Sequence, residues 1–512
     1  MLIQGCEILG FDPEHNSTPY RGDIRLEGAL IAEIGDGLAP KAGETVLDGL
    51  GKLVTPGLVN AHLHSQEALF KGRYDNLPLE LWMLYAYPIL NAQRISPELI
   101  YLRTMLVGME ALRNGVTTVV DDVIELPAQS MDQLDAVFRA YDDLGIRANV
   151  SGHIINRPFV DTVPFGRHAV PAEVSAQVDA IELVTEAEYL DYSIEAFSRF
   201  HGRSGRLRYV LAPSGPQRVT EPLLIKMAEL ARVQDAQYHI HVLETKMQAE
   251  TGKILYGRTL VEYLSDIGVL DKHTTLAHSI WVSDEDMRIL GEAGASVAHN
   301  PIANSKLGAG IAPFRKLLDF GVNVALGSDG LCNGSARMFD VIRMAALLHK
   351  VTTPNFEEWP SAEEVLSAAT LGGARSCLLE ESIGSIEVGK AADLVIYDLN
   401  TIPFTPRNDI RNHLVYSEDG SSIDRVFVNG EIVFESGALT KVDQSAMLEE
   451  FRDLAAHALR NHGDIEKANA VFHQPFVDIH EWASSQPSSV NRYSTPPVDW
   501  NDYGRGSPLY HV

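Results

Sequence analysis

The feature that most constrains this chain is an alternation of short apolar runs and amphipathic stretches between residues 56 and 380. Each apolar run has the length and composition of a strand buried on both faces. The stretches between them, such as PELIYLRTMLVGMEALRNG and DQLDAVFRAYDDLG, have helical periodicity. Eight strand–helix units around one core predict an α/β fold, a (β/α)8 TIM barrel. The eight predicted strands are GLVNAH, GVTTVVD, IRANVSG, LRYVLAP, QYHIHV, TTLAHS, ASVAHN and VNVALGSD.

The segments on either side of the barrel have a different sequence pattern. Residues 1–55 and 381–442 contain short strand-like runs separated by Gly and Asp, with Asn429-Gly430 at a hairpin position. We expect these two segments to form one small β-sandwich domain built from both ends of the chain. Residues 443–512 begin with an amphipathic helix and continue as an aromatic-rich tail without periodicity. Such a tail is expected to pack on its own barrel or on a neighbouring subunit.

Charge and cysteine content exclude several classes of function. The 512 residues include 42 Lys and Arg and 69 Asp and Glu, which gives a net charge of −27. A chain this acidic repels phosphate backbones and anionic lipids, so we expect no nucleic acid and no membrane among its partners. Its three cysteines are too far apart for a disulfide framework or a zinc knuckle. With no signal-peptide pattern and no apolar run of about 18 residues, we expect a cytoplasmic protein.

Histidines gather at the ends of successive predicted strands. His62 and His64 end the first strand, and residues i and i+2 share one face of a strand. His239 and His241 share a face of the fifth strand in the same way, so either could be a metal ligand. His278 ends the sixth strand. Because barrel active sites lie at the C-terminal ends of the strands, this placement predicts an active site there.

These residue types suit one divalent metal ion. Three neutral imidazoles and one carboxylate leave a coordination position for water, whose pKa the metal lowers toward 7. His62, His64 and His241 supply the nitrogens, and Asp329 at the end of the eighth strand supplies the carboxylate. His239 lies one layer deeper and is interpreted as a packing or supporting residue. The fourth strand offers no lysine for a bridging carbamate, which favours a mononuclear site.

Two further groups at the same rim can carry out acid–base chemistry. Glu244 follows His241 by three residues and can move a proton between water and a leaving nitrogen. His278 can hydrogen-bond to the attacking hydroxide or to the developing oxyanion.

The motifs that contain these residues identify a family. They are PGLVNAHLHS, KGRYDNLPLELW, HIHVLET, LAHSIWV, HNPIANSKLGAGIAP, LGSDG and GSIEVGKAADLVIYDL, and they span about residues 50 to 435. Through them the chain resembles the amidohydrolase superfamily, in particular the aminohydrolase branch of S-adenosylhomocysteine/methylthioadenosine deaminases, guanine deaminase and triazine hydrolases. The resemblance implies one zinc ion, with iron or manganese as alternatives. It assigns the metal to His62, His64, His241 and Asp329, proton transfer and water activation to Glu244 and His278, and a second role as proton acceptor to Asp329.

Departures from the family pattern bear on the substrate. Adenosine-type members have a Glu after Pro-Ile that holds the ribose hydroxyls, where this chain has Leu90. An Arg after the third strand is replaced by Ser151-Gly152-His153, and the Pro-His of the fourth strand is Pro213-Ser214. We therefore expect a flatter, more apolar pocket than a nucleoside needs. The inserted stretch LELWMLYAYPIL is interpreted as a packed helix or as a lid over the barrel mouth. The predicted substrate contacts are Trp82, Leu90, His299 and Asn304.

The leading hypothesis is a hydrolytic deaminase of an aminotriazine, aminopyrimidine or purine-like heterocycle. A metal-bound hydroxide would attack the ring carbon that carries the amino group, and ammonia or an amine would leave. The first alternative keeps this hydroxide but cleaves a C–Cl bond or a non-ring amide or urea C–N bond. A barrel without catalysis that serves as a scaffold is a second alternative, which the complete ligand set argues against. We expect a homodimer or homotetramer, with residues 465–512 as a candidate interface element.

Overall fold

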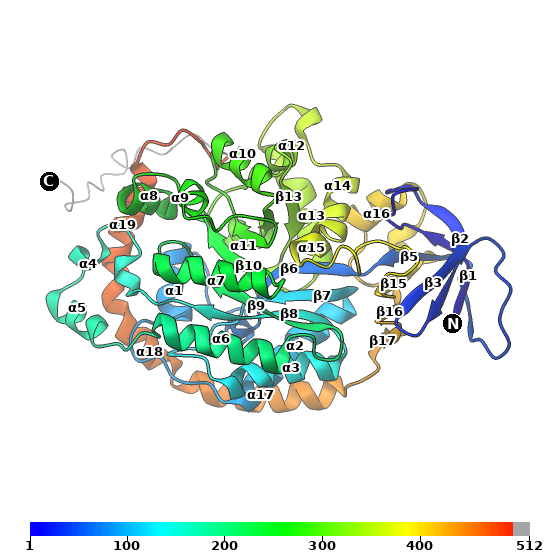
Figure 1. Cartoon of the computed structure of the whole chain (residues 1–512), viewed down its shortest axis with the longest axis horizontal. Coiled ribbons are helices and arrows are strands. Elements are labelled where there is room, and N and C mark those ends of the chain that lie inside the picture. The colour runs from blue at the N-terminus through cyan, green and yellow to red at the C-terminus, as the bar shows by residue number, and fades with distance from the viewer. Residues whose placement is uncertain (495–512) are drawn as a thin grey trace.

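A computed structural model describes residues 1–494 of the chain, and a parallel barrel lies at its centre (Figure 1). The predicted (β/α)8 architecture is confirmed. Its strands pair side by side in the order β13-β12-β11-β10-β9-β8-β7-β6-β14. Only Gly327 and Ser328 separate β13 from β14, so both ends of this path belong to one eighth strand, which closes the barrel. The strands are β6 (Leu58–His64), β7 (Val116–Asp121), β8 (Arg147–Ile154), β9 (Leu207–Pro213), β10 (Tyr238–Val242), β11 (Thr274–His278), β12 (Ser296–His299), β13 (Asn323–Leu326) and β14 (Asp329–Gly330).

Helices surround the barrel and bury one apolar face each against it. The second of them, α3 (Met131–Leu144), illustrates why the sequence folds this way. Ser130 and Gln133 form a capping box at its start, and Gly145 ends it with a positive φ of 76°. The other helices of this layer are α2 (Pro97–Arg113), α6 (Glu186–Phe200), α7 (Glu221–Val233), α8 (Lys246–Tyr256), α9 (Leu260–Asp266), α10 (Asp284–Ala293), α11 (Pro301–Lys306), α12 (Phe314–Asp319), α13 (Met338–Leu348), α14 (Ala362–Ala368) and α15 (Leu371–Ser376).

The β unit built from both ends of the chain is confirmed, and its strands form one hydrogen-bonded sheet in the order β18-β17-β16-β15-β5-β1-β2-β3, with β4 paired to β1 beside this path. Strand β5 from the N-terminal segment pairs antiparallel with β15 from the C-terminal segment, which joins the two parts. The buried guanidinium of Arg147 on β8 donates to the Asp393 carboxylate at 2.8 Å and ties the barrel to this sheet. The strands are β1 (Leu2–Ile8), β2 (Tyr20–Glu27), β3 (Leu30–Gly35), β4 (Val46–Asp48), β5 (Lys52–Pro56), β15 (Leu394–Asp398), β16 (Ile423–Val428), β17 (Glu431–Glu435) and β18 (Ala438–Leu439), with helix α16 (Ile410–Tyr416) between β15 and β16.

The C-terminal helices run along the barrel to the end opposite this sheet (Figure 1). Helix α17 (Gln444–Arg460) packs on α2, whereas α18 (His462–Asn469) and α19 (His473–Ser485) pack on α1 (Leu79–Ala86). Helix α19 also contacts α8 and the short helix α4 (Gly166–Ala169), next to α5 (Ala172–Asp179). The tail therefore covers its own barrel as far as residue 494. Part of the predicted aromatic-rich tail, with Trp500, Tyr503 and Tyr510, lies outside the described residues. Within residues 1–494 we find no helix that could cross a membrane.

Candidate active site

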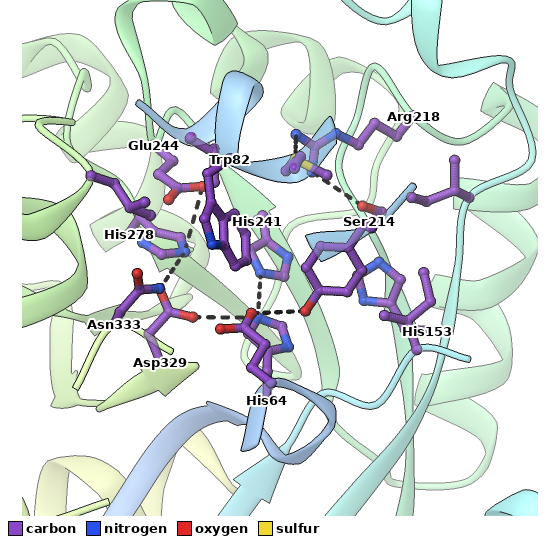
Figure 2. A pocket seen from close by; sticks show the side chains of 17 residues that line it. His64, Trp82, His153, Ser214, Arg218, His241, Glu244, His278, Asp329 and Asn333 are labelled. Carbon is purple, nitrogen blue, oxygen red and sulfur yellow. Dashed lines mark hydrogen bonds and ion pairs between the residues drawn. The ribbon is translucent and has the colours of Figure 1, made fainter. Parts of the chain in front are cut away.

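A cavity lies at the C-terminal ends of the barrel strands, where the sequence predicts the site. It encloses about 480 Å³ of space, part of it open to solvent. Leu79, Trp82 and Met83 of α1 form an apolar wall. Of the two interpretations of this stretch, the packed helix is confirmed, because α1 packs on the C-terminal helices and lines the cavity. A lid stays a prediction. Figure 2 shows the imidazoles and carboxylates of the opposite wall turned toward one shared space.

The imidazole cluster, which we define as His62, His64 and His241, has buried rings that approach one another closely. The Nε2 atoms of His64 and His241 are 3.2 Å apart. Oδ1 of Asp329 lies 3.6 Å from Nε2 of His62 and 3.4 Å from Nε2 of His64. Three nitrogens and a carboxylate oxygen from β6, β10 and β14 thus converge as the register of the strands predicts.

The far side of each imidazole has its own neighbour. His62 Nδ1 is 2.8 Å from Nε2 of His239, and His64 Nδ1 donates to the Asp122 carbonyl at 2.7 Å. His241 Nδ1 lies 3.7 Å from the Asp122 carboxylate. Such contacts fix the ring orientation and leave the opposite nitrogen for a ligand. In agreement, His62 Nε2 is buried without a hydrogen-bond partner among the described residues.

Ligand-type atoms in this region form three overlapping groups within residues 1–494, so the donor set fits a metal ion. The atoms within each group lie within 4.8 Å of one another. All four predicted ligands belong to these groups, and Asp122, Glu67 and His278 join them. The groups are His62, His64, Asp122 and His241; His62, His278 and Asp329; and His64, Glu67 and Asp329.

Asp122 is already occupied by other donors. Ser151 Oγ donates to its Oδ1 at 2.7 Å, and His153 Nδ1 lies 2.9 Å from its Oδ2. It faces Nδ1 of His241, the nitrogen opposite the one that meets His64. These contacts favour a supporting role for Asp122 over direct metal binding.

Glu244 and His278 lie beside the imidazole cluster. Oε2 of Glu244 is 3.7 Å from Nε2 of His278, which is 3.9 Å from Oδ2 of Asp329. Burial raises the pKa of the Glu244 carboxyl well above its ordinary value, and the nearby Asp329 carboxylate adds to the effect. Burial also lowers the pKa of His278, so its ring is neutral. Its Nδ1–H donates to Oδ1 of Asn304 at 2.8 Å, which leaves Nε2 as an acceptor facing the cavity.

The backbone is strained at two of these residues. His278 has a φ of 72° and Asp329 a φ of 61°, in the left-handed region that side chains with a Cβ avoid. Each such conformation costs about 1–3 kcal/mol and persists where the surrounding packing determines it. Both residues end a barrel strand, so the strain turns their side chains at the rim where the cavity lies.

Sequence reasoning missed several residues of the wall, foremost among them Glu67. Both of its oxygens accept hydrogen bonds, from Tyr87 Oη at 2.8 Å and from Cys332 Sγ at 2.6 Å. Burial raises the pKa of the Glu67 carboxyl to about 7. The sequence could have indicated Glu67, because it is an acidic residue three positions after the predicted metal ligand His64. The other missed residues of the wall are Tyr87, Ile124, Ile155, Arg218, Leu307 and Asn333, whereas His153 and Ser214 also line it and are identified in the sequence only as departures from the family pattern.

Among the four predicted substrate contacts, Trp82 lines the cavity and the other three do not. Leu90 packs in an apolar cluster with the C-terminal helices, because its backbone N–H is held by Asn469 Oδ1 at 2.9 Å. His299 is buried behind the rim with its Nε2 3.3 Å from that of His349. Asn304 instead accepts the hydrogen bond from His278. The prediction that Leu90, His299 and Asn304 line the substrate pocket is therefore corrected.

Comparison with known proteins identifies a matching family and similar enzymes. Residues 53–433 match the model of the Amidohydrolase family. The chain is 33% identical over 463 residues to 5-methylthioadenosine/S-adenosylhomocysteine deaminase of Caldanaerobacter subterraneus subsp. tengcongensis, covering 90% of this chain and 99% of the relative. It is 33% identical over 462 residues to 5'-deoxyadenosine deaminase of Methanosarcina acetivorans, covering 89% and 97%.

Solved structures of similar fold include two enzymes. Triazine hydrolase of Arthrobacter aurescens superposes with a TM-score of 0.80 at 25% identity, over 89% of this chain and 99% of that one. An adenosine deaminase from Xanthomonas campestris with bound zinc superposes with a TM-score of 0.77 at 27% identity, over 89% and 98%.

Proposed function

The chain belongs to the amidohydrolase family, and on that premise we propose that it is a metal-dependent hydrolytic deaminase of an aminated nitrogen heterocycle. The observation that carries the proposal is the convergence of the imidazole cluster and Asp329 with Glu244 and His278 at one cavity. The two deaminases that share 33% identity with this chain support the same reaction class.

We propose that the imidazole cluster and Asp329 hold the metal, with zinc as the ion. Imidazole nitrogens with one carboxylate are a ligand set that zinc takes, and the adenosine deaminase of similar fold was solved with zinc. Iron or manganese would fit the same donors. When bound, the ion supplies a water of lowered pKa and a positive charge next to the reacting carbon.

The protein's own groups then handle the protons. Glu244 takes a proton at its carboxylate from the water that adds to the ring carbon, and its raised pKa suits it to hold that proton. It passes the proton to the amino nitrogen as the C–N bond breaks, so that ammonia leaves. His278 accepts a hydrogen bond from the water at Nε2, because its Nδ1–H is committed to Asn304. Asp329, within 3.9 Å of His278, is a second proton acceptor.

The shape of the site supports an aromatic substrate with a substituent. Trp82 and Tyr87 bring aromatic rings to the wall, with their centroids 5.4 Å apart. A second, larger cavity of about 1680 Å³ shares Met83, Tyr87, Ile124, His153 and Ile155 with the first. A flat ring can therefore lie near the imidazole cluster while a side group extends into the adjoining space.

The test is ammonia release from a panel of aminopyrimidines, aminotriazines and adenine derivatives by zinc-loaded protein. We expect turnover of at least one member, its loss after chelation and its return with zinc. No ammonia from any member by protein shown to contain metal would refute deamination.

A second candidate is dechlorination of a chloro-substituted heterocycle. It is favoured by the 0.80 TM-score to triazine hydrolase, because the same groups can add water at a ring carbon that carries chloride. Chloride and ammonia measured on one substrate that carries both groups separate the two reactions.

We also propose that the protein works in a reducing, cytoplasmic compartment. Its three cysteines are free and buried, and none needs an oxidising environment. A homodimer or homotetramer stays a prediction, which analytical ultracentrifugation can test.

A further inference from the structure

Arg218 is the basic residue of the wall whose side chain has no role in the proposed mechanism. Its side chain comes from the loop after β9 and lines the cavity, yet it is 95% buried, with 5% relative exposure. Nη1 donates to Ser214 Oγ at 3.3 Å and Nη2 to Met83 Sδ at 3.3 Å (Figure 2). Nε has no hydrogen-bond partner among the described residues. Two weak contacts thus serve a group with five N–H donors.

A guanidinium in this position is costly. Burial lowers the pKa of Arg218, but an arginine keeps its charge inside proteins. Among residues 1–494, Arg218 forms no ion pair with a carboxylate, although Glu244 and Glu80 are close enough to stabilise its charge through space. A buried charge without a hydrogen-bonded counter-ion destabilises a fold, so such a group is retained where a ligand completes it.

The local sequence explains how the guanidinium reaches the cavity. Ser214 is the first residue after β9, and its Oγ accepts the hydrogen bond from Nη1 of Arg218. Both residues line the cavity, so the short loop that joins them holds the guanidinium at this wall.

We propose that Arg218 is a specificity-determining residue that binds an anionic oxygen group on the substrate. The group is a ring carboxylate or a ring oxygen that carries negative charge. The planar guanidinium can donate two parallel N–H bonds to a carboxylate, or converging N–H bonds to a single oxygen. This inference rests on the proposed function for the reaction at the other end of the ring. It narrows the substrate class from aminated heterocycles to those with an acidic oxygen on the side away from the amino group.

A different role for Arg218 would be electrostatic support of Glu244. In that case its removal would change the turnover number of every substrate by the same factor and shift the acidic limb of the pH profile. A recognition role would change KM for oxygen-bearing substrates alone. The two roles are therefore separable in one set of kinetics.

The experiment measures binding to the zinc-loaded enzyme. Calorimetry follows the binding of pyridine-3-carboxylate, 3-hydroxypyridine and 3-methylpyridine to the wild type, Arg218→Gln and Arg218→Lys. We expect the methyl compound to be unaffected and the favoured oxygen compound to lose about 10- to 100-fold in affinity in Arg218→Gln. Arg218→Lys keeps the charge but not the planar pair of donors, so it should recover only part of the loss.

A comparison of the affinities for the three compounds identifies which oxygen group Arg218 binds. A loss confined to the carboxylate assigns a carboxylate, and a loss confined to the hydroxyl compound assigns a ring oxygen. Equal affinity of all three compounds for the wild type, or equal losses for all three in Arg218→Gln, would overturn the proposal. Because these probes carry no amino group, Arg218-dependent binding would stand even if the ammonia assay refuted deamination. Thermal unfolding serves as the control for folding: removal of an unpaired buried charge should not lower stability.

Discussion

Replacement of Glu244 by Gln tests the proton transfer at the centre of the mechanism. The change keeps the volume and removes only the ability to hold a proton, a role typically worth 10²–10⁴-fold in rate. Glu67 cannot take over this role, because both of its oxygens already accept hydrogen bonds. Asp329 is the second proton acceptor and can retain part of the activity, so the whole of that range applies. We expect kcat to fall by about 10²–10⁴-fold, or about 2.7–5.5 kcal/mol at 1.36 kcal/mol per tenfold.

The assay is ammonia release under saturating substrate, with the metal content of each preparation measured by mass spectrometry. Glu80→Gln is the matched control, since Glu80 is a buried acid of the same region that does not line the cavity. It should stay within tenfold of the wild type. A Glu244→Gln variant that retains metal and also stays within tenfold would refute the proton-transfer role. Loss of metal from that variant would assign Glu244 to the metal site instead.

Three further substitutions test the metal ligands, the hydrogen bond between Asn304 and His278, and the packing of the C-terminal helices. His241→Ala removes one nitrogen of the imidazole cluster and should abolish metal retention on dialysis, whereas His201→Ala, outside the site, should retain the metal. Asn304→Leu removes the acceptor of the His278 Nδ1–H, so kcat should fall by about 10- to 100-fold with metal content unchanged; an unaltered kcat would contradict the positioning role. Asn469→Leu removes the acceptor for the Ile89 and Leu90 amides. It should lower the free energy of unfolding by about 1–3 kcal/mol without loss of metal, as measured by thermal unfolding. An unchanged unfolding midpoint would show that these hydrogen bonds do not hold the C-terminal helices in place.

The parts of the site that the sequence predicts are those set by strand register. His62 and His64 must share a face because side chains alternate along β6, and the same rule applies to His239 and His241 on β10. Parallel pairing then brings the C-terminal ends of neighbouring strands to one rim. Asp329 could be placed for the same reason, although its left-handed backbone could not.

The parts that the sequence does not predict lie in connections between elements, where no periodicity fixes direction. The sequence predicts Leu90 as a substrate contact, but Asn469 of α18 accepts a hydrogen bond from its backbone N–H, and its side chain packs with residues of the C-terminal helices. Arg218 lines the cavity for a related reason. The loop after β9 turns so that the guanidinium of Arg218 donates a hydrogen bond to Ser214, four residues earlier. In this fold, such loops determine which substrate is bound. The chemistry at the strand ends can therefore be predicted from the sequence, whereas the residues that recognise the substrate depend on contacts between distant segments.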